Sequence, residues 1–284
     1  LKQFDETKDI PVFFLTAKSD QQSEAFGLNL GAVDYIAKPI IPNLVLLRIK
    51  NQLEIKQLRD HLNEQVIEKT EDLRKTMKVL LTSLGALAEY RDPETGEHIR
   101  RTQLIVQRLA QELLTNPKFN VFIKSREYVD YYATAAPLHD IGKVGITDEI
   151  LRKPGRLDDE ERKVMMNHPR MGYDVLLGAT KELHDNPMVR IAADMALAHH
   201  ERWDGSGYPE GLSGENIPFE ARVMAVADVY DALVSKRCYK DQMSFSTAFN
   251  YIVENMGKIF DPSLKWAFIN SRTKLEAYYK SVEH

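Results

Sequence analysis

Residues 131–143 read YYATAAPLHDIGK and residues 199–209 read HHERWDGSGYP, and these two stretches decide the fold and its chemistry. In the first, an apolar helix-like run ends at His139 and Asp140, and Lys143 follows. An adjacent histidine and aspartate can give one nitrogen and one oxygen to a metal site, and the carboxylate can bridge two ions. Lys143 shares the helical face and is well placed to meet phosphate oxygens. By itself the stretch is equally compatible with a helix-terminal histidine and a surface lysine.

Further candidate ligands lie along the chain. Glu94 and His98 are four residues apart, which puts both on one face of a helix, although such polar pairs are common. His199 and His200 end another helical run and open a glycine-rich loop. Asp228 lies in so apolar a helix that its carboxylate needs a partner, either a metal ion or a buried salt bridge.

The whole candidate set has more members than one ion needs. It comprises Glu94, His98, His139, Asp140, His168, His199, His200 and Asp228. Imidazoles and carboxylates in this number suit two or three first-row ions such as iron or manganese, with zinc less favoured. Two-metal sites support in-line displacement at phosphorus, so the set predicts a metallophosphohydrolase.

From about residue 83 onward the pattern is helical almost throughout. Helix-length runs rich in alanine and leucine cover residues 101–114, 129–138, 189–200 and 221–234. Asp158, with Glu161 three residues later, predicts a capping box at a helix start. The fold class is therefore expected to be mainly α.

The first 40 residues read as α/β. Residues 12–15 are a short apolar run typical of a buried parallel strand, residues 34–37 read as a second strand, and residues 23–30 between them read as a helix. Two strands are too few for a stable doubly wound sheet. This segment is expected to be the end of a domain whose beginning is absent here.

Residues 44 to about 90 predict one long helix, because they contain no proline and a single glycine, Gly85. Its apolar residues recur at steps of three and four: Ile55, Leu58, Leu62, Val66, Leu73, Met77, Leu80 and Leu84. So narrow a stripe favours a coiled-coil seam between two chains, which predicts a homodimer. The alternative is a helix that lies along its own domain.

Composition limits the function further. The chain has 284 residues, with 43% hydrophobic and 28% charged residues, and its net charge is −4. With this negative net charge, an overall positive potential of the protein cannot be the main contribution to binding a nucleic acid polymer. Cys238 is the only cysteine, so neither an intrachain disulfide nor a cysteine-based zinc site is possible. Without a signal peptide or an apolar run of membrane length, the expectation is a cytoplasmic protein with no membrane insertion.

Residues 83 to about 270 resemble the HD-GYP family, a branch of the HD phosphohydrolases. The resemblance rests on the sequences at residues 139–143, 153–155, 168–169 and 199–209, and it continues through residues 211–233. Residues 10–40 separately resemble the last part of a response-regulator receiver, with Thr16 at the switch position and Lys38 before a cis-proline. The implied domains are the end of a flavodoxin-like receiver at 1–43, a linker helix at 44–82 and a helical HD-type catalytic domain at 83–284.

The HD-GYP resemblance implies hydrolysis of cyclic di-GMP to pGpG and, in some members, on to GMP. It implies the candidate set above as metal ligands, with Glu94 binding a third ion. Asp140 and Lys143 are the implied catalytic residues, and the implied ligand-binding residues are Lys143, Tyr208, Arg237 and Lys240. The family often has proline where this chain has Cys238, so the loop there is expected to be looser.

The resemblance also implies partners and leaves two alternatives open. The implied partners are a cognate histidine kinase and diguanylate cyclases. One alternative is a phosphohydrolase that acts mainly on pGpG or another nucleotide. The other is a weakly catalytic module that signals through protein contacts. The complete ligand set argues against this second alternative.

Overall fold

The computed structural model describes residues 2–4, 6–16, 21–90, 97–183, 186–235 and 242–282. The chain divides into two compact units, residues 1–76 and residues 77–284. In the described residues no helix has the length and apolarity that crossing a membrane requires.

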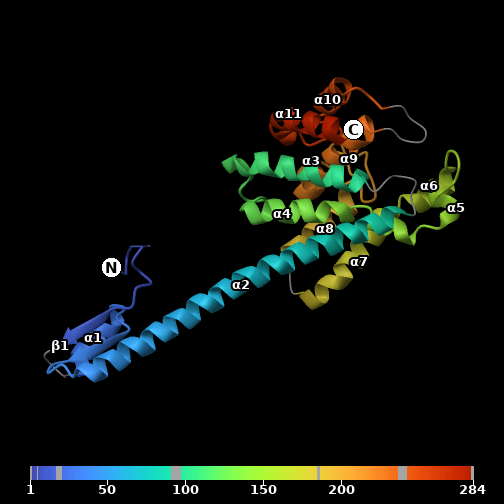
Figure 1. The fold of residues 1–284 in the computed structure, drawn as a ribbon. Coiled ribbons are helices and arrows are strands. Elements are labelled where there is room, and N and C mark those ends of the chain that lie inside the picture. Colours follow the sequence, from blue (N-terminus) through green and yellow to red (C-terminus); the bar gives the residue numbers. More distant parts are fainter. Residues whose placement is uncertain are drawn as a thin grey trace. The chain divides into compact units, whose positions relative to one another are not determined.

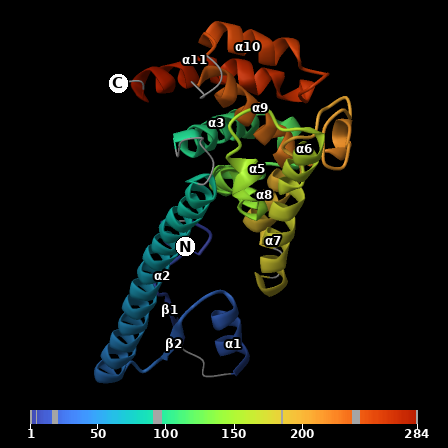
Figure 2. The same cartoon turned by 90° about the vertical axis from the view of Figure 1, so that its right-hand side faces the viewer.

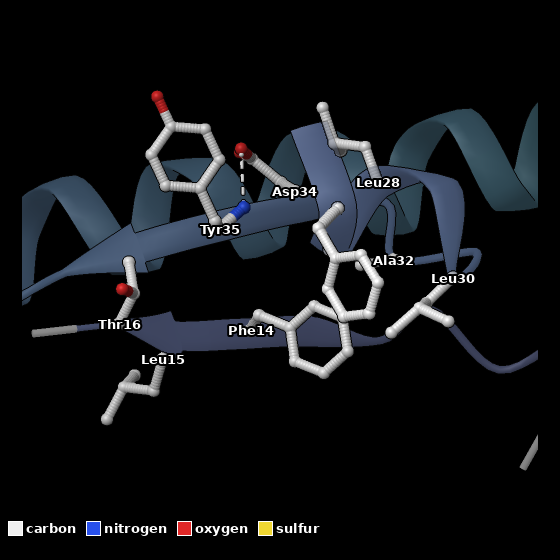
Figure 3. Close-up of a pocket in the computed structure, with 10 residues that line it drawn as sticks. Phe14, Leu15, Thr16, Leu28, Leu30, Ala32, Asp34 and Tyr35 are labelled. Atoms are coloured by element: carbon white, nitrogen blue, oxygen red, sulfur yellow. Dashed lines mark hydrogen bonds between the residues drawn. The ribbon is translucent and has the colours of Figure 1, made fainter. Parts of the chain in front are cut away.

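The first unit contains a small parallel sheet. Strands β1 (Phe13–Thr16) and β2 (Asp34–Ala37) pair with Phe13 opposite Asp34, and helix α1 (Gln21–Asn29) connects them. Figure 3 shows apolar side chains of this sheet and its connection around an open hollow, among them Phe14 and Leu30. Phe14 is 39% exposed, although parallel sheets are normally covered on both faces. These features are consistent with a partial α/β segment.

Helix α2 (Pro42–Tyr90) is continuous over 49 residues, as the absence of interior proline predicts (Figures 1 and 2). All eight apolar residues of its predicted stripe are exposed. The prediction of a long helix ahead of the helical domain is confirmed.

The second unit is helical, so the prediction of a mainly α fold is confirmed. Its α-helices are α3 (Glu97–Leu114), α4 (Arg126–Ala135), α5 (Asp148–Leu151), α6 (Asp159–Met165), α7 (His168–Leu183), α8 (Pro187–Ala198), α9 (Phe219–Val234), α10 (Phe245–Glu254) and α11 (Lys265–Val282). Short 3-10 helices lie between them: η1 (Pro117–Phe119), η2 (Ala136–Leu138), η3 (Ile141–Gly145), η4 (Gly214–Asn216) and η5 (Pro262–Leu264). The predicted capping box at Asp158 is present, with Glu161 closing it from α6.

The core of this unit lies between α3, α4, α8 and α9, which contact one another in pairs. Helices α10 and α11 cover this group on one side, where α10 contacts α9 and α11 contacts α3 (Figures 1 and 2). Large buried side chains fill the centre, including Tyr132, Tyr230 and Phe268. On the other side α7 packs against α8 and η3. The ends of several of these elements meet at one place, and the candidate ligands among the described residues lie there.

Candidate metal centre

Five different elements bring together the candidate ligands that the structure describes. His98 lies in the first turn of α3, and His139 and Asp140 follow η2. His168 begins α7, and Asp228 lies in the middle of α9. His199 and His200 follow the last residue of α8. All of these ligands except Asp228 therefore lie at or next to the end of a helix.

The first cluster consists of Asp140, His168, His199 and His200, whose ligand atoms all lie within 4.8 Å of one another. Asp140 Oδ1 is 3.0 Å from His168 Nε2 and 3.5 Å from His199 Nε2. The structure thus brings together four residues that are up to 60 positions apart in the sequence.

The second cluster consists of Glu89, His98 and His139. His98 Nε2 is 3.7 Å from Glu89 Oε1 and 3.6 Å from Asp228 Oδ1, so Asp228 adjoins this cluster. Asp140 joins the two clusters, because its other oxygen, Oδ2, is 3.4 Å from His139 Nε2. One carboxylate therefore faces both groups of imidazoles.

The imidazoles are oriented as metal ligands are. The Nδ1 atoms of His139 and His168 are 2.8 Å from the backbone carbonyls of Ala136 and Met165, and His199 Nδ1 is 3.0 Å from Met195 O. In His98 the corresponding partner is a carboxylate, that of Asp231. Such contacts fix the ring and its tautomer and leave Nε2 to the metal.

The inward-facing atoms lack hydrogen-bond partners within the described part of the chain. They are Nε2 of His98, His139, His168 and His199, Oδ1 of Asp140 and both carboxylate oxygens of Glu89. Metal–ligand bonds of about 2.0–2.1 Å put two ligand atoms about 3.0 Å apart at a right angle and about 3.4 Å apart at the tetrahedral angle. The separations of 3.0 to 3.7 Å in the two clusters match this spacing, so the residues fit divalent metal ions.

Glycines permit the close approach that forms the first cluster. A Cβ atom on Gly142 would lie 1.9 Å from the backbone oxygen of His168, so a larger residue would separate η3 from α7. This contact brings Asp140, two residues before Gly142, beside His168. The glycine of the Ile141-Gly142-Lys143 sequence is therefore part of the site's construction.

Residues 83–264 match the HD domain family. The chain belongs to the HD domain family.

Named relatives cover most of this chain. It is 43% identical over 277 residues to a probable cyclic di-GMP phosphodiesterase of Vibrio cholerae serotype O1, which corresponds to 95% of this chain and 63% of that protein. It is 36% identical over 283 residues to the cyclic di-GMP phosphodiesterase response regulator RpfG of Xanthomonas campestris pv. campestris, 97% of this chain and 71% of that protein. A 3'3'-cGAMP-specific phosphodiesterase 2 of Vibrio cholerae is 39% identical over 193 residues, 68% of this chain and 34% of that protein. The chain thus spans less than two thirds of the first of these relatives.

Where the two clusters of the HD domain meet, the charges of Asp140, His139 and Lys143 shift one another's protonation equilibria. Burial disfavours a charged Asp140, yet Lys143 and His139 together hold the pKa of this carboxyl well below its usual range. Burial likewise opposes protonation of His139, but the adjacent Asp140 raises its pKa to about 9. For His200, burial pushes the pKa well below its usual value, which favours the neutral imidazole that binds metals.

Two further predicted residues lie beside the HD-domain clusters. Lys143 Nζ is 2.8 Å from Asp140 Oδ2, and its side chain is 13% exposed. The ring of Tyr208 stacks on that of His200 with 4.7 Å between centroids. A hydrogen bond within the loop that carries Tyr208 stabilises it, because the buried Glu201 accepts from the backbone N–H of Glu210. Glu94, Arg237 and Lys240 lie outside the described residues.

Sequence reasoning missed two residues of the HD-domain site. Glu89 lies in the last turn of α2. The apolar residues Leu87 and Ala88 before it are only a weak indication of burial, because α2 contains many other acidic residues. Asp231 follows Asp228 by three residues on α9, and this spacing on one helical face could have identified it. Asp231 is 1% exposed and its Oδ2 is 2.6 Å from His98 Nδ1.

Asp231 is expected to tune the metal centre through His98. Its carboxylate also accepts hydrogen bonds from Arg101 and Tyr279, which fix its position. Asp231→Asn removes the charge behind the imidazole and is expected to weaken binding of one ion by about 10–100-fold. Titration with Mn²⁺ followed by electron paramagnetic resonance measures this affinity.

The matched control is Asp261→Asn. Asp261 is also buried and bonded to an arginine, Arg222, at 2.7 Å, but it contacts neither cluster. This variant is expected to keep the wild-type Mn²⁺ affinity. Equal affinities in Asp231→Asn and wild type would contradict the role of Asp231.

Proposed function

We propose that this HD domain is a metal-dependent phosphodiesterase that hydrolyses cyclic di-GMP and belongs to the HD-GYP branch. The observation that carries the proposal is the position of Asp140 between the two clusters. Its Oδ1 atom faces His168, its Oδ2 atom faces His139, and Lys143 contacts the same carboxylate. Two adjoining metal sites next to a cation suit displacement at a phosphodiester. The names of the relatives that align with nearly the whole chain support cyclic di-GMP as the substrate.

The proposed ligands are divided between the two clusters. Asp140, His168, His199 and His200 would hold one ion, and His98, His139, Asp140 and Asp228 would hold another, with Glu94 as the proposed ligand of a third. Iron or manganese is the proposed metal, since imidazole and carboxylate ligands suit both. When bound, such ions supply Lewis-acid chemistry that neutralises charge on phosphoryl oxygens.

The protein's own groups position the substrate. The ammonium group of Lys143 would donate to a non-bridging phosphoryl oxygen, where negative charge grows during hydrolysis. Tyr208, held against His200 by stacking, would contact the ligand at the edge of the first cluster. Arg237 and Lys240 would bind the phosphates and guanine bases. The product would be pGpG, with GMP as a second product if a third ion binds.

A second candidate substrate is 3'3'-cGAMP, because a relative of that specificity aligns with 68% of this chain. The discriminating experiment uses the chain purified anaerobically and loaded with Fe²⁺ or Mn²⁺. Turnover of cyclic di-GMP, 3'3'-cGAMP and pGpG is then compared by chromatography of the products. The proposal expects cyclic di-GMP to have the highest kcat/KM, and preference for either of the others would replace it. No turnover with either metal would favour the signalling-module alternative.

We further propose that the protein is a homodimeric response regulator whose α2 helices pair. The exposed apolar positions Ile55, Val66 and Met77 recur every 11 residues, as do Leu62, Leu73 and Leu84. An 11-residue repeat favours straight or slightly right-handed pairing of helices. Phosphorylation by a histidine kinase would alter this pairing and thereby activity, and diguanylate cyclases are further proposed partners.

The double substitution Leu58→Gln and Leu62→Gln is expected to dissociate the dimer, because both side chains lie on the stripe and are exposed by 61% and 49%. Sedimentation equilibrium measures the change in mass. Ile67→Gln is the matched control: it is equally apolar and 71% exposed, but at 100° per residue it lies about 140° around the helix from Leu62. A dimer that survives the double substitution would show that α2 is not the seam.

A further inference from the structure

Glu89 has an unusual environment for a carboxylate. It is 2% exposed, and neither of its oxygens has a hydrogen-bond partner within the described residues. Its ion-pair contact in the described part of the chain is the imidazole of His98, at 3.7 Å. Burial raises the pKa of its carboxyl to about 7. A carboxylate so placed needs either a proton or a cation, because an isolated buried charge is very costly.

The geometry favours a cation over a proton. A protonated carboxyl would donate a hydrogen bond to an acceptor about 2.7 Å away, and neither oxygen of Glu89 makes such a bond to any of the described residues. Instead, Glu89 Oε1 faces His98 Nε2, which Asp231 orients from the opposite side of the ring through Nδ1. His139 Nε2, which also lacks a hydrogen bond among the described residues, completes a group of three ligand atoms within 4.8 Å of one another.

We propose that Glu89 is a direct ligand of the ion that His98, His139, Asp140 and Asp228 would hold. This inference rests on the metal dependence of the proposed function, but not on the identity of the substrate. It assigns to helix α2 a part of the metal centre that the predicted ligand set did not include. With Glu89, the donor set consists of two imidazole nitrogens and oxygens of three carboxylates, which suits iron or manganese.

The packing of α2 explains how Glu89 reaches the cluster. Gly85 lies one turn before Glu89, and a Cβ atom there would be 2.3 Å from the backbone oxygen of Pro137. Pro137 belongs to η2, the turn directly before His139 and Asp140. Close backbone contact at Gly85 therefore fixes the distance between the end of α2 and the ligands that follow η2. Occupancy of this metal site consequently depends on how α2 is seated.

The test measures metal binding to the whole chain with Mn²⁺ as the probe. Glu89→Gln keeps the shape of the side chain and removes its charge. We expect the variant to bind one Mn²⁺ fewer per chain, or to bind that ion at least about 10–100-fold more weakly, since even indirect partners of a ligand have effects of this size. Its thermal stabilisation by Mn²⁺ is expected to decrease accordingly. Wild-type stoichiometry and affinity in Glu89→Gln would overturn the proposal.

Two further variants sharpen the result. Glu89→Asp retains the charge but withdraws the oxygens by one methylene, so a ligand is expected to lose the ion here too. Retention of the ion in Glu89→Asp would overturn direct ligation, and the remaining role of Glu89 would be to balance the positive charge of the ion. The control is Asp194→Asn, which removes another carboxyl whose pKa burial raises, to about 6, and is expected to bind Mn²⁺ as wild type does. A wild type that binds Mn²⁺ without hydrolysing cyclic di-GMP would refute the proposed function and leave this inference standing.

Discussion

Replacing Asp140 with alanine is expected to lower phosphodiester hydrolysis by more than about 10³-fold and to reduce the bound metal. The reason is its position: Oδ1 is 3.0 Å from His168 Nε2, and Oδ2 is 3.4 Å from His139 Nε2. Asp140 therefore contacts an imidazole of each cluster. Loss of this single carboxylate should therefore impair both metal sites together. Elemental analysis of the purified protein and turnover of cyclic di-GMP measure the two effects.

His139→Ala is expected to give the same pair of losses, since His139 belongs to the second cluster and adjoins Asp140. Asp130→Ala serves as the control, because Asp130 lies exposed on α4, away from both clusters. An Asp140→Ala protein with full metal content and near-normal turnover would remove Asp140 from the site.

Replacing Lys143 with alanine is expected to separate chemistry from metal binding. The rate of hydrolysis should fall by about 10²–10³-fold, the size of the effect of one charge-stabilising donor, while the metal content stays near that of wild type. The ammonium group contacts Asp140 Oδ2 at 2.8 Å, but an ammonium ion has no lone pair with which to bind a metal. Metal analysis and single-turnover kinetics test the two parts.

Lys143→Met preserves the length of the side chain without its charge, and Lys143→Arg preserves the charge with another geometry. If stabilisation of phosphoryl charge is the role, methionine should behave as alanine does, and arginine should recover part of the rate. Loss of metal from both uncharged variants would show that Lys143 acts by keeping Asp140 ionised, and the assigned contact with the substrate would be wrong.

Much of the candidate site could be read from the sequence because its ligands come in local pairs. His139 with Asp140 and His199 with His200 are adjacent residues at helix ends, and Asp228 is conspicuous as a charge in an apolar helix. Asp231 could have been suspected, since it shares a face of α9 with Asp228. Sequence alone, however, does not distinguish a carboxylate that orients a metal-binding histidine from an acidic residue on the surface. The helices themselves followed from composition and spacing, which act over one or two turns.

The sequence by itself determined the mainly helical class, the long helix α2 and the residue types of a metal centre, because backbone propensity and apolar periodicity are local properties. Only the tertiary structure decided how these ligands divide into two clusters, since Asp140 meets His168 through the contact between Gly142 and α7. It also decided the place of Glu89. One acid among many on α2 becomes a buried, unpartnered carboxylate in the described structure only because Gly85 lets the helix lie against Pro137. Burial of this kind depends on contacts between residues about 50 positions apart, which no local pattern records.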